Sequence, residues 1–196
     1  AYNLNLWRLG VTGGRFPNSD YRATDFAGRV DFDLPSGTHL KMISRQTGSE
    51  LGNYQNDATQ EPNARVEHTR ELTGLEISGA VAEAVNSRLL LGRTSSTYFY
   101  EDLIDDNDTS NYRTTKELER VSVEWQGDAR VYDLGPAAGT VTAGFSWEEE
   151  SGSADARGWD GGVDSENHID RSRSARAAFA QHRLELWESL TLDAGM

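Results

Sequence analysis

The sequence contains no cysteine, and none of its apolar runs is long. Without cysteine, neither a disulfide framework nor a thiolate metal site can form. No segment approaches the roughly 20 apolar residues that a membrane-spanning helix needs. Basic residues are also few, 19 against 32 acidic ones, and the resulting net charge of -13 opposes binding to a nucleic-acid backbone. These absences argue against a disulfide-stapled module, a helical membrane protein and a nucleic-acid partner.

Arrangements that support catalysis are missing as well. The sequence has no Gly-x-Ser-x-Gly elbow for a serine nucleophile. The glycine-rich residues 10–14 lack the Lys-Ser/Thr of a phosphate-binding loop and indicate a turn. The four histidines lie in separate segments, and none has a partner at zinc-ligand spacing: His39, His68, His168 and His182. We therefore expect a protein that is not an enzyme.

What the sequence does contain is a repeated alternation of apolar and polar residues. Between residues 21 and 34, Phe26, Val30 and Phe32 alternate with polar side chains, and Pro-Ser-Gly at residues 35–37 then predicts a tight turn. This pattern is typical of a β-hairpin. Similar stretches occur at residues 2–11, 40–45, 75–81, 89–101, 120–125, 140–147, 171–187 and 190–194.

Connections between these stretches alternate between short and long. Tight turns are expected at residues 35–37, 85–87 and 188–189, whereas residues 127–136 are ambiguous. Aperiodic Gly-, Asn- and Asp-rich segments predict three long loops, at residues 47–64, 102–114 and 148–170. In the last hairpin Phe179 is out of phase with Leu184 and Leu186, which predicts a bulge near Gln181.

The predicted fold is all-β, an antiparallel up-and-down meander of about nine strands. Short turns would gather at one edge of the sheet and long loops at the other, as in a transmembrane β-barrel. The apolar side chains, such as Phe26, Ile77, Val123 and Phe145, would then contact lipid. The polar side chains between them would point into the lumen: Arg29, Asp31, Lys41, Arg45, Glu76, Arg120 and Glu124.

Aromatic residues near the strand ends suggest girdles at the two membrane interfaces. Two tryptophans precede expected short turns, and four further aromatic residues precede expected long loops. The first group is Trp125 and Trp187; the second is Tyr98, Phe99, Tyr100 and Trp147.

Acidic loops are the candidate metal sites. Residues 102–111 read DLIDDNDTSN, and the carboxylates of Asp105, Asp106 and Asp108 could surround a calcium ion, which takes six to eight oxygen ligands. The loop lacks the residue order of an EF-hand, and solvated loop carboxylates are the alternative interpretation. A weaker candidate of the same kind is formed by Trp159, Asp160, Asp164 and Glu166.

The ends of the chain suggest an excerpt from a longer protein. Ala1 leads directly into strand-like sequence without a signal peptide, and the last residue lies within another such stretch. We therefore expect residues 1–196 to be one partial β-barrel domain of a larger receptor. Alone, it would leave two unpaired strand edges, and we expect such a piece not to insert stably into lipid.

The final hairpin resembles the strand pairs of TonB-dependent outer-membrane receptors. The resemblance lies in Ala-Phe-Ala-Gln at residues 178–181 and Leu-Thr-Leu-x-Ala-Gly at residues 190–195, and the hairpin at residues 26–45 is of the same style. In that family a plug domain precedes a barrel of about 22 strands. The resemblance implies an outer-membrane location in a Gram-negative bacterium and import of a scarce nutrient such as a ferric siderophore, cobalamin or a glycan. It also implies TonB as a partner through a plug domain.

Two other classes of protein remain open at this point. A soluble β-sandwich that binds carbohydrate would explain the polarity and the tryptophans, but it would mix long and short connections at both ends. A small complete barrel of about eight strands would carry its own signal sequence and closing strand. Burial of Phe26, Ile77, Val123 and Phe145 between two stacked layers would favour the sandwich.

Overall fold

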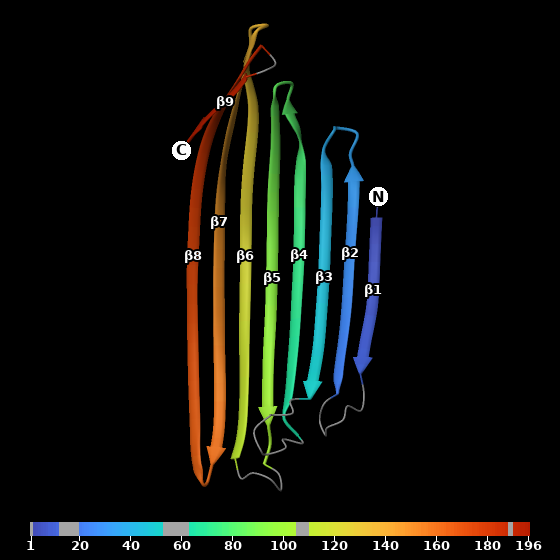
Figure 1. The fold of residues 1–196 in the computed structure, drawn as a ribbon, viewed down its shortest axis with the longest axis vertical. Coiled ribbons are helices and arrows are strands. Elements are labelled where there is room, and N and C mark those ends of the chain that lie inside the picture. Colours follow the sequence, from blue (N-terminus) through green and yellow to red (C-terminus); the bar gives the residue numbers. More distant parts are fainter. Residues whose placement is uncertain (1, 12–19, 53–62, 105–109, 188–189) are drawn as a thin grey trace.

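The computed structural model describes residues 2–11, 20–52, 63–104, 110–187 and 190–196. Within these residues the chain forms nine strands in one antiparallel sheet, and each strand pairs with its neighbours in sequence (Figure 1). The strands are β1 (Tyr2–Val11), β2 (Tyr21–Asp33), β3 (His39–Gly52), β4 (Arg65–Ala82), β5 (Val85–Asp102), β6 (Ser110–Asp133), β7 (Ala137–Asp160), β8 (Val163–Leu186) and β9 (Leu190–Gly195).

This topology confirms the predicted meander and excludes the sandwich. All nine strands lie in a single sheet in sequence order, so the described residues contain neither a second layer nor a Greek-key crossover. None of the described segments forms a helix long and apolar enough to cross a membrane.

Strand register places the apolar side chains on one face of the sheet, here called the apolar face. Residues directly opposite each other in an antiparallel pair point to the same side. Phe26, Ile77, Val123 and Phe145 therefore share a face, and no second layer covers them; Phe145 is 45% exposed. One row is apolar on every strand from β2 to β7, and Arg176 follows it on β8: Val30, Met42, Leu75, Leu91, Val123 and Trp147.

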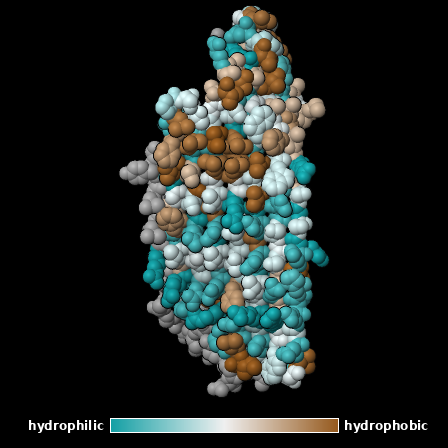
Figure 2. All heavy atoms as spheres, turned by 180° about the vertical axis from the view of Figure 1, so that it is seen from behind, coloured by the Kyte–Doolittle hydropathy of each residue, from teal (hydrophilic) through white to brown (hydrophobic). Residues whose placement is uncertain are grey.

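The apolar side chains cover only the half of the sheet near the turns that join β2 to β3, β4 to β5 and β6 to β7. On β7, Val141, Phe145 and Trp147 are followed on the same face by Glu149 and Ser151. In Figure 2 the hydrophobic residues gather in a band toward one end of the molecule, and hydrophilic residues cover much of the remainder. We call the apolar rows on this face, from the row of Leu91 to the nearby tight turns, the apolar band.

Strands β6, β7 and β8 have 24 residues each and extend far beyond this band. A tilted strand needs only about 9–11 residues to cross a bilayer. The prediction of a long loop at residues 148–170 is wrong. Strands β7 and β8 continue through these residues and are joined by a tight turn at Gly161 and Gly162, whose φ angles are 56° and 92°. Outside the band both faces are polar, so the alternation disappears although the backbone ladder continues.

The structure also corrects the boundaries of other predicted loops and turns. Residues 47–52 and 110–114 belong to strands rather than to long loops, and the turn expected at residues 85–87 lies at residues 83–84. The turn at residues 35–37 is confirmed, with Gly37 at a φ of 78°.

The bulge expected near Gln181 is absent. The register between β7 and β8 runs without a shift, and Phe179 points to the face opposite the apolar face, where its ring lies over Gly144. The register shifts found among the described residues lie at Ala80/Ala82 and Arg130/Tyr132. Both are near tight turns, where bulges add local twist.

Candidate functional site: the polar face of the sheet

The face opposite the apolar face carries the residues predicted to line a lumen, and we call it the polar face. Register places all seven of them there, as predicted: Arg29, Asp31, Lys41, Arg45, Glu76, Arg120 and Glu124. The alternation along each strand explains this result, because successive side chains of a strand point to opposite faces of the sheet.

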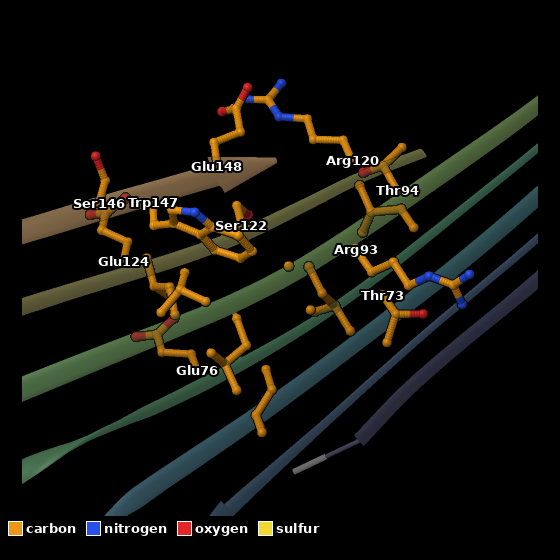
Figure 3. A pocket seen from close by; sticks show the side chains of 18 of the residues that line it. Thr73, Glu76, Arg93, Thr94, Arg120, Ser122, Glu124, Ser146, Trp147 and Glu148 are labelled. Atoms are coloured by element: carbon orange, nitrogen blue, oxygen red, sulfur yellow. The ribbon is translucent and has the colours of Figure 1, made fainter. Parts of the chain in front are cut away.

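Many of these charges are paired across strands at the level of the apolar band. Lys41 Nζ lies 2.5 Å from Glu76 Oε2, and Arg88 Nε lies 3.1 Å from the other oxygen of that carboxylate. Arg120 donates a hydrogen bond to Glu148, and Figure 3 shows these two side chains reaching toward each other. The charges therefore form local cross-strand pairs that join neighbouring strands.

A groove of about 560 Å³ lies among these pairs on the polar face. Its wall includes charged residues from β3, β4, β6 and β7 and a small apolar patch formed by Ile43, Leu72 and Leu90. Gly74 belongs to this patch because a Cβ there would lie 2.9 Å from Ile43 Cγ1. The groove thus offers a mixed polar and apolar surface at the level of the apolar band.

A second cluster on the polar face lies beyond the band, toward the long-loop end. Tyr98, Tyr100 and Tyr112 share this face, and we call them the tyrosine patch. The rings of Tyr100 and Tyr112 are 5.9 Å apart between centroids, and Lys116 Nζ lies 5.4 Å from the centre of the Tyr98 ring. Phenol rings bind large ligands well because they combine apolar area with a hydrogen-bonding group.

Sequence reasoning missed this patch and placed Tyr98 and Tyr100 in an aromatic girdle instead. Two observations correct that assignment: both tyrosines are on the polar face, and Phe99, although on the apolar face, lies eight positions beyond Leu91 of the band. The alternation of Tyr98, Phe99 and Tyr100 was a usable signal, because residues i and i+2 of a strand share a face.

The three tryptophans predicted to lie in the aromatic girdles differ in their positions. Trp147 lies in the outermost row that is apolar from β2 to β7, where its neighbour on β8 is Arg176, and this edge position agrees with the girdle expected for it. Trp125 lies within the band and stacks on Phe145, with ring centroids 6.0 Å apart, so it is not at the rim. Trp187 is 68% exposed next to the last turn.

The main candidate metal site is not tested by the structure. Asp105, Asp106 and Asp108 lie outside the described residues. In the weaker candidate, Asp160 points to the opposite face from Asp164, and Glu166 pairs with Arg157 at 3.0 Å. The described part of the chain contains no group of three or more His, Cys, Asp or Glu side chains placed to hold a metal ion.

Comparisons with known proteins rest on the fold. No family model matches the sequence, and no curated protein matches it. Among solved structures, the unliganded ferric citrate transporter FecA matches with a TM-score of 0.70 at 14% identity, over 99% of this chain. BauA, the ferric preacinetobactin receptor of Acinetobacter baumannii, matches with a TM-score of 0.69 at 7% identity, again over 99% of this chain. The sheet has the fold of a TonB-dependent receptor barrel.

The receptor-barrel fold is present here only in part. The chain covers 32% of the FecA chain and 36% of the BauA chain. FpvA of P. aeruginosa, solved with a bound ferric pyoverdine, gives a TM-score of 0.68 at 14% identity, with 92% of this chain and 30% of that chain covered. The similar structures are transporters and receptors, and their likeness at these identities describes architecture.

Proposed function

We propose that this chain forms part of the wall of an outer-membrane transporter of the TonB-dependent type, in a Gram-negative bacterium, that imports a scarce nutrient. The observation that carries this proposal is the single sheet with an apolar band on one face and paired charges on the other. Such a sheet buries neither face against itself, so it needs lipid on one side and a water-filled or protein-filled lumen on the other.

A ferric siderophore is the favoured nutrient, with cobalamin or a glycan as the alternatives. Two of the similar structures named above are a ferric citrate transporter and a ferric preacinetobactin receptor, which supports this choice. Within the chain, the tyrosine patch offers rings and a cation outside the band, where an incoming ligand would first meet the polar face. TonB would act through a plug domain that occupies the lumen.

The location can be tested by fractionation of cells that express the full-length protein. We expect recovery in outer membranes after detergent extraction. Recovery in the soluble periplasmic fraction would contradict the transporter proposal.

The ligand surface can be tested with Tyr98→Ala combined with Tyr112→Ala. We expect at least a tenfold weaker binding of a ferric siderophore by the purified protein, and poorer growth on that siderophore as the iron source. Phe99→Ala is the matched control, because Phe99 lies on the same strand and points to the opposite face, beside Arg113. Equal losses in both variants would show a general effect on folding rather than a ligand surface.

A further inference from the structure

Charges are sorted by face in the part of the sheet beyond the apolar band. On the polar face, three successive rows run from β4 to β8 without an Asp or a Glu: Arg70, Ser96, Leu118, Gly152 and Arg171; His68, Tyr98, Lys116, Ala154 and Ile169; Val66, Tyr100, Thr114, Ala156 and Asn167. The opposite face carries the carboxylates of this region: Glu67, Glu71, Glu117, Glu119, Asp155 and Asp170. In a chain with 32 acidic and 19 basic residues, composition alone does not predict a surface without carboxylates.

The lysine and the two arginines of these rows have no carboxylate partner. They are Arg70, Lys116 and Arg171, and we call them the cation triangle. Within the part of the chain that the structure describes, none of them takes part in an ion pair, and all three are exposed. Lys116 Nζ lies 5.4 Å from the centre of the Tyr98 ring, and Arg171 donates a hydrogen bond to the backbone oxygen of Asp170. The triangle is therefore a positive surface that is not neutralised by its own face.

Carboxylates in the rows on either side of the triangle already have partners. Glu150, in the next row toward the band, accepts a hydrogen bond from Arg173 Nη2 at 2.7 Å. Asp102, in the next row toward the ends of the strands, accepts a hydrogen bond from the Tyr100 hydroxyl at 3.2 Å. Binding of an anion to the triangle would therefore break no ion pair of the triangle itself.

The register also sets the spacing of the three cations. Lys116 lies two strands and two residues away from each arginine, which is about 12 Å between backbones at about 4.8 Å per strand and about 3.3 Å per residue. Between the two arginines stand Ser96, Leu118 and Gly152, and a Cβ at Gly152 would lie 3.4 Å from Leu118 Cδ1. Serine and glycine leave the surface low on both sides of Leu118. A small molecule resting there is within reach of long basic side chains from several directions.

We propose that the cation triangle and the tyrosine patch together bind a ferric chelate of net negative charge. The inference rests on the proposed function and narrows its nutrient from ferric siderophores in general to anionic ones. Guanidinium groups form strong, often bidentate, hydrogen bonds with carboxylate oxygens, and phenol hydroxyls donate to the same oxygens. A chelate with carboxylate or catecholate oxygens matches this surface, whereas a cationic chelate is repelled by it.

The test measures binding to the purified full-length protein in detergent. The probes are ferric citrate in excess citrate, iron-free citrate, an uncharged ferric trihydroxamate, and a ferric trihydroxamate that carries an amine. Arg70→Gln with Arg171→Gln removes two charges, and Arg70→Glu with Arg171→Glu reverses them. Arg113→Gln is the matched control, because Arg113 lies on the same strand as Lys116 and points to the opposite face.

We expect the unmodified protein and the control to prefer ferric citrate to both trihydroxamates and to iron-free citrate. The double glutamine variant should bind ferric citrate about tenfold or more weakly, since charge-assisted hydrogen bonds are lost, with little change for the uncharged chelate. The double glutamate variant should prefer the amine-bearing chelate. Added salt should weaken the binding of ferric citrate far more than that of the uncharged chelate.

Equal affinity for chelates of all charges, or equal affinity for ferric and iron-free citrate, would overturn the inference. So would equal losses of ferric citrate and uncharged chelate in the double glutamine variant. Any of these results in a protein that binds a ferric chelate and fractionates with the outer membrane leaves the transporter proposal standing. A soluble protein, or one that binds no ferric chelate, would remove both.

Discussion

The guanidinium of Arg45 on β3 donates two hydrogen bonds to one carboxylate oxygen of Asp25 on β2, at 3.1 Å from Nε and 2.5 Å from Nη2. Asp25 is only 3% exposed, whereas the side chain of Arg45 is 59% exposed. A buried carboxylate is thus neutralised by a cation that reaches it from the solvent side. The pair joins β2 to β3 on the polar face beyond the band.

Replacing Arg45 with Ala should therefore lower the free energy of unfolding by about 1–3 kcal/mol, because a buried carboxylate loses its charged donor. Arg22→Ala is the matched control: its contact with Glu50 is 3.5 Å long and exposed, and such pairs contribute about 0–1 kcal/mol. Urea titration of the full-length protein in lipid vesicles measures both. Similar small losses would show that Asp25 does not depend on Arg45.

The two faces of β7 predict opposite responses to a positive charge. Phe145→Lys places an ammonium group against lipid and should cost about 2–4 kcal/mol of folding free energy. Ser146→Lys places the same group on the polar face, at the groove, and should cost far less. The folded fraction in vesicles at increasing urea is the measurement, and equal effects at the two positions would contradict the assignment of faces.

Gly144 should tolerate no side chain. A Cβ there would lie 2.6 Å from the Phe179 ring and 2.6 Å from the backbone oxygen of Trp125, so the backbone would have to move. Gly48 has nothing within 4 Å of the same position. Gly144→Ala should thus lower the yield of heat-modifiable protein severalfold while Gly48→Ala leaves it near the unmodified level. A folded Gly144→Ala protein of unchanged stability would show that the contact with Trp125 is relieved without cost.

The tip of the β7–β8 hairpin should respond to pH through His168. Its Nδ1 lies 2.6 Å from Asp155 Oδ1, and this hydrogen bond with the carboxylate charge raises the pKa of His168 above its ordinary value. A raised pKa in the folded state means that the pair stabilises the tip below the unfolded pKa of about 6.5. The contribution is lost as pH rises through the folded pKa.

Titration of the His168 imidazole by NMR checks this expectation. Asp155→Asn should lower the pKa of His168, whereas Asp164→Asn on the same hairpin should leave it nearly unchanged. Because both side chains of the pair are more than half exposed, the effect on overall stability should be small. A pKa unaffected by Asp155→Asn would show that the pair does not form in solution.

Calcium binding by Asp105, Asp106 and Asp108 stays a prediction. If the loop binds calcium, isothermal titration of the full-length protein should show a site that disappears when all three residues are changed to Asn. Asp164→Asn is a suitable control, since Asp164 belongs to no group of three or more His, Cys, Asp or Glu side chains placed to hold a metal ion. Identical calcium titrations of the triple variant and the unmodified protein would identify the loop as solvated.

Much of the fold followed from the sequence because part of most strands carries apolar side chains on one face and polar side chains on the other. Where Phe26 and Val30 alternate with polar residues, the period itself assigns faces, and all seven predicted lumenal residues proved to share one face. Beyond the band this signal fails, since both faces of residues 148–170 are polar and no period distinguishes a strand from a loop there.

The sequence by itself determined the strand order, the positions of several tight turns and the side on which the seven predicted lumenal residues point. Local alternation and turn chemistry are enough for these features, because each depends on neighbouring residues. Only the tertiary structure decided that β6, β7 and β8 continue far past the band and that Tyr98, Tyr100 and Tyr112 meet on one surface. Those features depend on backbone pairing between distant segments, which holds a polar strand in place whatever the pattern of its side chains.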